Sequence, residues 1–312
     1  MVSLQDIATI NPKSDPLQNT FIYIDLEAVE KGELRKIQEI MREEAPSRAQ
    51  RVIDNNDILF QCVRPYQKNN YIHRILNTSN QQWVASTGYA QIRTTELPNY
   101  IYHLLNTDEF NRKVMVRCTG SSYPAINSED LATIHLYYTP DKKEQLKISR
   151  LLDLLDKRIA TQNKIIEKLQ SLIKGLRVCC MQRVYGNNVY LSEIAQIYQP
   201  QTISSTELTE DGFLVYGANG IIGKYKDYNH ETEQICITCR GNTCGMVNYT
   251  KPMSWITGNA MVINTDKYQD KVCKRYLYHY LSAYNFNSII SGSGQPQIVR
   301  TPLEKLKITL PT

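Results

Sequence analysis

One glycine-rich stretch of the chain has the spacing of a phosphate-binding loop. It runs from Ala218 to Tyr225 and reads ANGIIGKY. A P-loop needs glycine at its first position for a tight turn, and it needs Ser or Thr after its lysine to hold magnesium. Ala218 and Tyr225 occupy those two places, so we exclude nucleotide binding here. The stretch instead predicts a glycine-rich hairpin.

Three cysteines are spaced like metal ligands. Cys236, Cys239 and Cys244 form a C-x2-C-x4-C pattern. A tetrahedral zinc site needs a fourth ligand, and no neighbouring Cys or His stands in a second paired motif. We therefore predict no metal site and expect buried thiols on strands. The eight cysteines are expected to be reduced, since no secretion signal precedes them.

Catalytic motifs are missing from the sequence. The five histidines stand in no H-E-x-x-H arrangement, and the chain has neither a G-x-S-x-G elbow nor a G-x-G-x-x-G fingerprint. It also lacks the Asp/Asn-Pro-Pro-Tyr/Phe segment of adenine methyltransferases and the Walker pair of a DNA translocase. We predict that the chain is not an enzyme and has no catalytic residue, so its function is binding.

The composition agrees with a binding protein. The chain has 312 residues, a net charge of +5, and 21 tyrosines against 5 phenylalanines and 2 tryptophans. Tyrosine rings carry a hydroxyl group that needs a polar or wet partner, which suits broad recognition surfaces. No apolar run approaches the roughly 18 residues of a membrane span. We expect no membrane association and a cytoplasmic location, because the N-terminus does not resemble a secretory signal.

The elements that position these residues occur twice. The segment Val2–Ser14 resembles Val189–Thr202 in its apolar positions, its acid and its Ile-Ala pair, and Cys118–Pro140 resembles Ser291–Thr312. Strands, a helix, a Gly-Ser turn and a last strand follow in the same order in both modules, with the helix expected at Pro98–Met115 and at Lys274–Phe286. We predict an α+β fold with two similar mixed α/β domains, at 1–139 and 187–312, joined by a long helix at 140–186.

The joining segment has the pattern of a coiled coil. From Asp141 to Arg183 it contains one glycine and no proline. Apolar residues and one glutamine recur at alternating spacings of three and four, at Leu152, Leu155, Ile159, Gln162, Ile166, Leu169, Ile173 and Leu176. This period of about 3.5 residues predicts a seam that needs a partner helix. A long amphipathic helix packed on its own domain is the alternative.

At this point the chain resembles the DNA-specificity subunits of type I restriction-modification systems. The resemblance lies in the helical segment, at Pro140, Glu144, Gln145, Ile148, Leu152, Asp156, Ile159, Ile166, Leu169 and Lys174. It continues in the modules, at Asp57–Ile72, Tyr216–Tyr225, Thr238–Val247, Trp255–Val262 and Ser291–Ile298. It implies two target-recognition domains that read a bipartite double-stranded DNA site, each in the major groove, with the helix setting their separation.

The resemblance also implies partners. Adenine-N6 methyltransferase subunits would use S-adenosylmethionine, and a restriction subunit would use ATP and magnesium, so we expect none of these cofactors on this chain. A second long helix would follow the second domain, and the printed sequence ends at Thr312, where that helix should begin. Either the helix lies beyond this sequence, or two copies pair in a homodimer through the seam from Leu152 to Leu176.

Residues that read DNA should lie on exposed loops rich in Arg, Lys, Asn and Gln, since these side chains contact guanine, adenine or phosphate. On that ground we predict DNA contacts in the first domain from Gln61, Arg64, Tyr66, Lys68 and Asn69. In the second domain we predict them from Asn219, Lys224, Arg240, Asn242 and Thr243, with Lys224 facing phosphates.

Two other functions stay open. The chain could be a coiled-coil assembly protein whose repeated modules bind a ligand other than DNA, and any DNA binding would then depend little on salt. It could also hide a nuclease or methyltransferase site, which would give turnover by the purified chain. Phosphate-dominated recognition instead weakens steeply with salt.

Overall fold

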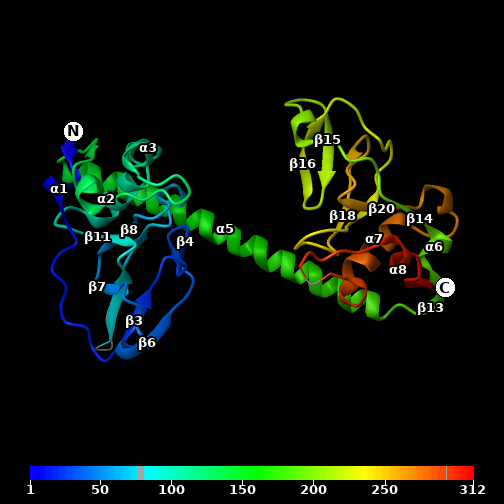
Figure 1. Ribbon diagram of the computed structural model, residues 1–312, viewed down its shortest axis with the longest axis horizontal. Helices are drawn as coiled ribbons and strands as arrows, with labels where there is room; N and C mark the ends of the chain where they lie inside the picture. The colour runs from blue at the N-terminus through cyan, green and yellow to red at the C-terminus, as the bar shows by residue number, and fades with distance from the viewer. Residues whose placement is uncertain (76–80, 293) are drawn as a thin grey trace. The chain divides into compact units, whose positions relative to one another are not determined.

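The computed structural model describes residues 1–75, 81–292 and 294–312 (Figure 1). It divides into two compact units, Met1–Gln162 and Asn163–Thr312. Each unit has its own sheets and its own hydrophobic core. The boundary between the units falls within helix α5 (Lys142–Gln182). Among the described residues, the helices are too short or too polar to span a bilayer.

The first unit contains two four-stranded sheets and two short two-stranded pairs, β1–β12 and β4–β5. The orders are β6-β3-β10-β7 and β2-β11-β8-β9, and only the β3–β10 pair is parallel in these two sheets. The strands are β1 (Val2–Ser3), β2 (Ala8–Ile10), β3 (Thr20–Ile24), β4 (Val29–Glu30), β5 (Glu33–Leu34), β6 (Gln38–Met41), β7 (Ala49–Ile53), β8 (Ile58–Gln61), β9 (Tyr71–Ile72), β10 (Gln82–Ser86), β11 (Tyr89–Thr94) and β12 (His135–Leu136).

The helices of the first unit are short, and one prediction about them is wrong. They are α1 (Leu4–Ile7), η1 (Arg42–Glu44), η2 (Pro65–Gln67), α2 (Pro98–Leu105), α3 (Asp108–Arg117) and α4 (Ser128–Ala132). The sequence predicts one helix over 98–115. The structure breaks it before Thr107, whose hydroxyl accepts a hydrogen bond from the Phe110 amide and caps the second helix.

Strand β8 shows how the first core is built. All four of its residues are buried, because side chains of successive residues point to opposite faces and both faces are covered. Ile58 and Phe60 enter the cluster beneath α2 and α3, where Phe60 meets Phe110 edge to face at 5.7 Å between ring centroids. Leu59 enters a second cluster with Trp83. The strand is therefore fixed from both sides up to the point where it ends at Gln61.

The second unit repeats this plan. Its sheets have the orders β14-β20-β17-β18, β16-β15-β19 and β13-β21. The elements are β13 (Gly186–Tyr190), α6 (Leu191–Ile194), β14 (Gln196–Tyr198), η3 (Ser205–Glu207), β15 (Phe213–Gly217), β16 (Gly220–Tyr225), β17 (Ile235–Thr238), β18 (Val247–Tyr249), β19 (Trp255–Ile256), β20 (Ala260–Asn264), η4 (Asp266–Tyr268), α7 (Lys274–Ala283), η5 (Phe286–Ile289), α8 (Arg300–Glu304) and β21 (Lys307–Pro311).

The registers of the strands confirm the predicted repeat. In the first unit Ile92 of β11 pairs with Ile58 on one side and Ile10 on the other. In the second unit Ile263 of β20 holds the same central place between Ile235 and Ile197. The predicted α+β class with two similar domains and a long joining helix is therefore correct.

Helix α5 is continuous over 41 residues. Only its first turns are buried, where Gln145 donates to the Thr139 carbonyl at 2.8 Å and to Glu96 at 3.0 Å. Farther along, the predicted seam is uncovered in the described structure, with Leu155 46% and Ile159 59% exposed. Further exposed apolar side chains lie outside the seam, at Leu151, Leu154, Ile165 and Leu172. The apolar face is thus wider than a two-helix seam requires.

Candidate nucleic-acid interface

The loop between β8 and β9 (residues 62–70) is fastened to the chain near residue 125. The Cys62 amide donates to the Gly88 carbonyl at 3.0 Å, and the Arg64 amide donates to the Pro124 carbonyl at 2.7 Å. The Ile126 amide returns a bond to the Cys62 carbonyl at 3.1 Å. These bonds bring two segments together that lie about sixty positions apart in the sequence.

The loop between β17 and β18 (residues 239–246) is fastened in the same way. The Cys239 amide donates to the Asn259 carbonyl at 3.1 Å, and the Gly241 amide donates to the Pro296 carbonyl at 3.0 Å. The Ile298 amide donates to the Cys239 carbonyl at 3.0 Å. Both units therefore fasten the start of the loop with equivalent backbone bonds, while the side chains on the loops differ, and the first loop continues into η2.

Gln61 does not lie on an exposed loop, and that prediction is wrong. It is the last residue of β8 and is 2% exposed. Its amide nitrogen donates to the Gln67 side chain at 3.0 Å, and its side-chain oxygen accepts from the Asn69 amide at 3.2 Å. The burial follows from the end of β8 being covered on both faces. Gln61 holds the β8–β9 loop in shape.

The other predicted residues of this loop differ in whether their side chains are bound by other groups of the protein. Lys68 donates to the Asn106 carbonyl at 3.1 Å and forms an ion pair with Asp108 at 2.5 Å. Tyr66 is 50% exposed. The Arg64 guanidinium lies over the Tyr123 ring, with its central carbon 4.3 Å from the ring centroid. In the described part of the chain this guanidinium has no hydrogen bond or ion pair.

Three of the predicted residues, Gln61, Arg64 and Asn69, line one cleft of about 940 Å³. The other lining residues are Leu26, Glu27, Val29, Glu30, Arg35, Arg48, Val63, Gln67, Thr87, Gly88 and Tyr123. Arg35 is held by Glu30 and Glu33 at 3.4 and 3.0 Å, whereas the Arg48 side chain is exposed and has no hydrogen bond or ion pair among the described residues. The sequence reasoning missed Arg48 and Tyr123, since they reach the cleft only through tertiary contacts.

In the second unit, one predicted residue, Asn219, lies at the tip of a hairpin. Strands β15 and β16 are joined by a two-residue turn at Ala218 and Asn219, and Figure 1 shows this hairpin projecting from the rest of its unit. The Thr243 hydroxyl donates to the Asn219 side chain, and the Thr238 hydroxyl donates to the Ala218 carbonyl. The hairpin predicted for this stretch is confirmed, and its tip is tied to the β17–β18 loop.

Arg240 and Asn242 are exposed on that same loop. Lys224 does not join them. It lies toward the other end of β16, opposite Leu214, and its ammonium is 3.5 Å from the Asp211 carboxylate. The structure thus brings Asn219 and Thr243 into contact beside Arg240 and leaves Lys224 apart.

Cys236 and Cys239 are buried thiols, as expected, whereas Cys244 is only partly buried, and of the three only Cys236 lies on a strand. Burial raises the pKa of Cys236 to about 12, and it also raises the pKa of Cys239, so both are protonated near neutral pH. The Cys239 thiol donates to the Asn259 carbonyl at 3.2 Å. Within the described residues, no group of three or more His, Cys, Asp or Glu side chains could hold a metal ion.

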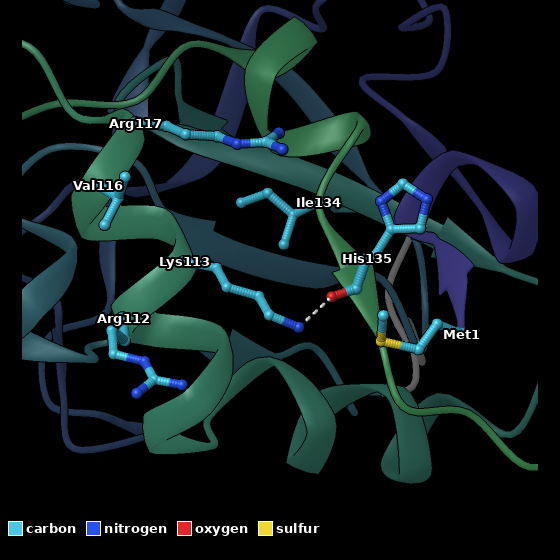
Figure 2. Close-up of a pocket in the computed structure, with 7 residues that line it drawn as sticks. All are labelled: Met1, Arg112, Lys113, Val116, Arg117, Ile134 and His135. Carbon is cyan, nitrogen blue, oxygen red and sulfur yellow. Dashed lines mark hydrogen bonds between the residues drawn. The ribbon is translucent and has the colours of Figure 1, made fainter.

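A second concave site of about 600 Å³ lies between α3 and β12. It is lined by Met1, Arg112, Lys113, Val116, Arg117, Ile134 and His135 (Figure 2). Lys113 donates to the His135 carbonyl at 2.8 Å, and Arg117 donates to the Asp130 carbonyl at 2.8 Å. Two of its three basic side chains therefore support the fold, and none of the predicted DNA-contacting residues lines it.

The family comparison decides what this repeated scaffold is. The model of the family described as type I restriction modification DNA specificity domain matches residues 1–171 and 187–312. The chain belongs to this family. Both family matches contain one loop scaffold, so the protein carries two DNA specificity domains, and the resemblance noted in the sequence is confirmed.

Individual relatives agree with this assignment. The specificity subunit of the type I restriction enzyme EcoprrI from Escherichia coli is 30% identical over 134 residues, which are 41% of this chain and 33% of that protein. The alignment thus spans a third of the length of that curated relative. The specificity subunit of the type I enzyme HindI from Haemophilus influenzae is 23% identical over 52% of this chain and 33% of its own length.

Two solved structures share the fold. The S subunit of a type I restriction-modification system from M. genitalium has a TM-score of 0.60 at 15% identity, over 98% of this chain and 83% of that chain. A chain from a structure concerned with complex assembly and conformational transition of a type I system has a TM-score of 0.58 at 21% identity, over 99% and 85%. At such identities the likeness concerns the architecture alone.

Proposed function

We propose that this chain is the DNA-specificity subunit of a type I restriction-modification enzyme and reads a bipartite double-stranded DNA target, one part with each unit. The observation that carries the proposal is the loop scaffold built twice, at 62–70 and 239–246, inside two domains of the DNA specificity family. One scaffold with different side chains is what two independent readers of different sequences require.

The side chains on the scaffolds support DNA as the ligand. Arg64 and Arg240 can donate hydrogen bonds to base edges and phosphates, and the Asn242 amide can both donate to and accept from base edges. The chain itself reads and does not react. Methylation of adenine, with S-adenosylmethionine, and restriction, with ATP and magnesium, belong to methyltransferase and restriction subunits. A protein with this role acts where the genome lies, so we place it in the cytoplasm.

The uncovered apolar face of α5 is the proposed docking surface for partner helices. Leu169 and Leu176 of the predicted seam are 52% and 54% exposed, and apolar side chains beside the seam widen the face. A face of this width suits packing against more than one helix. We assign it to helices of the methyltransferase subunits, with pairing of two copies of this chain as the second arrangement.

Co-purification with a methyltransferase subunit, followed by sequencing of methylated adenines in exposed DNA, tests the proposed function. A split motif whose two parts change separately, when the β8–β9 loop or the β17–β18 loop is replaced, supports two readers. Methylation without any motif would refute it. Binding to DNA that hardly responds to salt would instead favour the assembly protein with a non-DNA ligand.

A pair of matched variants tests the helix face. Leu169→Glu places a charge in the predicted seam, whereas Ser171→Glu places the same charge on an exposed residue two positions farther along, on the opposite side of the helix. We expect the first variant to abolish the complex and any dimer, and the second to keep both, as measured by light scattering on the separated species. Equal effects of the two variants would contradict the seam.

A further inference from the structure

Arg64 has a backbone conformation that arginine rarely adopts. Its φ and ψ are 55° and 53°, in the left-handed region, and Pro65 follows it. Residues other than glycine avoid this region because their Cβ atom crowds the backbone. The equivalent residue of the other unit is Gly241, with φ at 86°. The backbone conformation at this position of the scaffold favours glycine, and the first unit has arginine there.

The fold holds this conformation through several contacts. The Arg64 amide donates to Pro124, and its carbonyl accepts from the Gln67 amide at 3.0 Å. Gln67 is held in turn by the buried Gln61. A strained residue persists only where its surroundings determine it, and such residues cluster at functional sites. Lys68 of the same loop is also left-handed, with φ at 53°, but its ammonium is engaged by Asp108, whereas the Arg64 guanidinium is not.

The guanidinium is positioned and unpaired. It lies over the Tyr123 ring at 4.3 Å, and stacking on an aromatic face limits the orientation of its plane. Of the neighbouring cations of the loop and cleft, Lys68 is engaged by Asp108 and Arg35 by Glu30 and Glu33. Arg48 is the other cation of the cleft that has no ion pair among the described residues. In the described structure, the donors of Arg64 are therefore left for a ligand.

The cleft beside Arg64 contains carboxylates as well as cations. Glu27 and Glu30 line it together with Arg48 and Arg64. Carboxylates repel a phosphate backbone, whereas a mixture of acids, amides and arginines matches the alternating donors and acceptors of base edges. The surroundings of Arg64 favour contact with a base over contact with the backbone.

On these grounds, and resting on the proposed function, we propose that Arg64 selects a guanine in the part of the target read by the first unit, and that Tyr123 positions its guanidinium. Arginine can donate two parallel hydrogen bonds to the O6 and N7 atoms of guanine, and no other base presents two acceptors there in the major groove. The second unit, with Gly241 at this place, has to read its part of the target with other side chains.

The first test replaces Arg64 with the residue of the other unit. In the complex with the methyltransferase subunit, Arg64→Gly removes the guanidinium and relieves the left-handed strain, so the fold is kept. We expect discrimination at one guanine of one half of the methylated motif to fall about 10- to 100-fold, with the other half unchanged. Lys31→Gly is the matched control, because Lys31 is also left-handed, with φ at 50°, and exposed.

The outcomes separate the proposal from the function on which it rests. If the unaltered complex methylates without a motif, the proposed function fails. If it has a motif that Arg64→Gly leaves unchanged while binding weakens equally on all sequences, Arg64 contacts phosphate and the proposal is overturned. A motif whose change maps to a base other than guanine also overturns it.

A second test changes the DNA. A duplex with the mapped motif is made with 7-deazaguanine, which lacks the N7 acceptor, at the position assigned to Arg64. We expect this base to weaken binding of the unaltered protein about tenfold and to leave Arg64→Gly unaffected. Tyr123→Phe should keep the discrimination because the ring remains, and Tyr123→Leu should reduce it. If 7-deazaguanine weakens binding of the unaltered protein and of Arg64→Gly equally, the assigned contact is refuted. If Tyr123→Phe and Tyr123→Leu lose discrimination equally, the positioning role of Tyr123 is refuted.

Discussion

The β8–β9 loop and the β17–β18 loop share a backbone and differ in what they carry. Each loop is tied by its first residues to a segment that follows a glycine with positive φ, Gly120 in one unit and Gly292 in the other. In the first unit the loop carries Arg64, which lines a cleft. In the second unit the loop carries Gly241 and contacts the tip of the β15–β16 hairpin. The comparison teaches that the scaffold specifies position while the side chains on it are free to change.

The largest effect is expected from a substitution that removes core packing beneath one of the two loops. Phe60 is 2% exposed and packs on Phe110 beneath the β8–β9 loop. Phe60→Ala should destabilise the first unit by about 3–5 kcal/mol, because the change leaves a cavity in a close-packed core. Hydrogen exchange should show lost protection in β8 and β11 and none in β17 and β20. Loss in both sheets would show that the units do not have independent cores.

A buried histidine in each unit gives a test with opposite signs. His73 is fully buried between Tyr71 and Trp83, and neither ring nitrogen has a hydrogen-bond partner among the described residues. His230 is also buried, but its ring nitrogens lie 2.8 Å from the Tyr198 hydroxyl and 2.6 Å from the Asn229 side chain. Burial lowers the pKa of both histidines below the usual 6.5.

A lowered pKa means that the unfolded chain takes up the proton first as the pH falls. Stability from the neutral histidines is therefore present above pH 6.5 and is lost as the pH falls from there toward their folded-state pKa. His73→Met should raise the free energy of unfolding by about 1–2 kcal/mol at pH 5 and less at pH 7.5, because it removes an unpaired polar ring. His230→Met should lower it at pH 7.5 by about 1–2 kcal/mol, since it breaks two hydrogen bonds. Denaturant unfolding at both pH values checks this, and equal signs would contradict it.

Much of this comparison could be predicted from the sequence because it rests on local patterns. The paired ends of the modules, the long helix and the β15–β16 hairpin follow from apolar spacing and turn residues. The cleft could not be predicted. Tyr123 and Arg48 reach Arg64 only through strand pairing and the bond to Pro124, which join distant segments.

Gln61 shows a second reason for failure. Its residue type is typical of a DNA reader, but the covering of β8 on both faces buries it, and burial turns its amide inward to the loop. The glycine at 241 and the arginine at 64 also look unrelated until the equivalent bonds to Pro296 and Pro124 align them. Equivalence between the units is a property of the fold, and residue identity alone does not reveal it.

The aligned position itself offers a smaller stability test. A Cβ added at Gly241 would meet no atom of the described residues within 4 Å, so a side chain there costs backbone strain. Gly241→Ala should destabilise the second unit by about 1 kcal/mol. Arg64→Gly should change the first unit by less, because relief of strain is offset by the greater freedom of glycine in the unfolded chain. Thermal unfolding of the two variants measures both effects, and a larger loss for Arg64→Gly would show that its side chain supports the fold.

Substitutions of the two predicted lysines should differ little in their effect on stability. They should differ most in their effect on the salt dependence of DNA binding. Lys68 is held by Asp108 and the Asn106 carbonyl. Among the described residues, the Lys224 ammonium has one partner, the exposed Asp211 carboxylate at 3.5 Å. A lysine free to contact phosphate displaces about one counterion, so Lys224→Met should reduce the slope of log affinity against log salt by about 1. Lys68→Met should leave the slope unchanged, because its ammonium is already engaged by the protein. Titration of duplex DNA across a range of salt concentrations separates the two, and a change for Lys68→Met alone would mean that the loop releases Lys68 on binding.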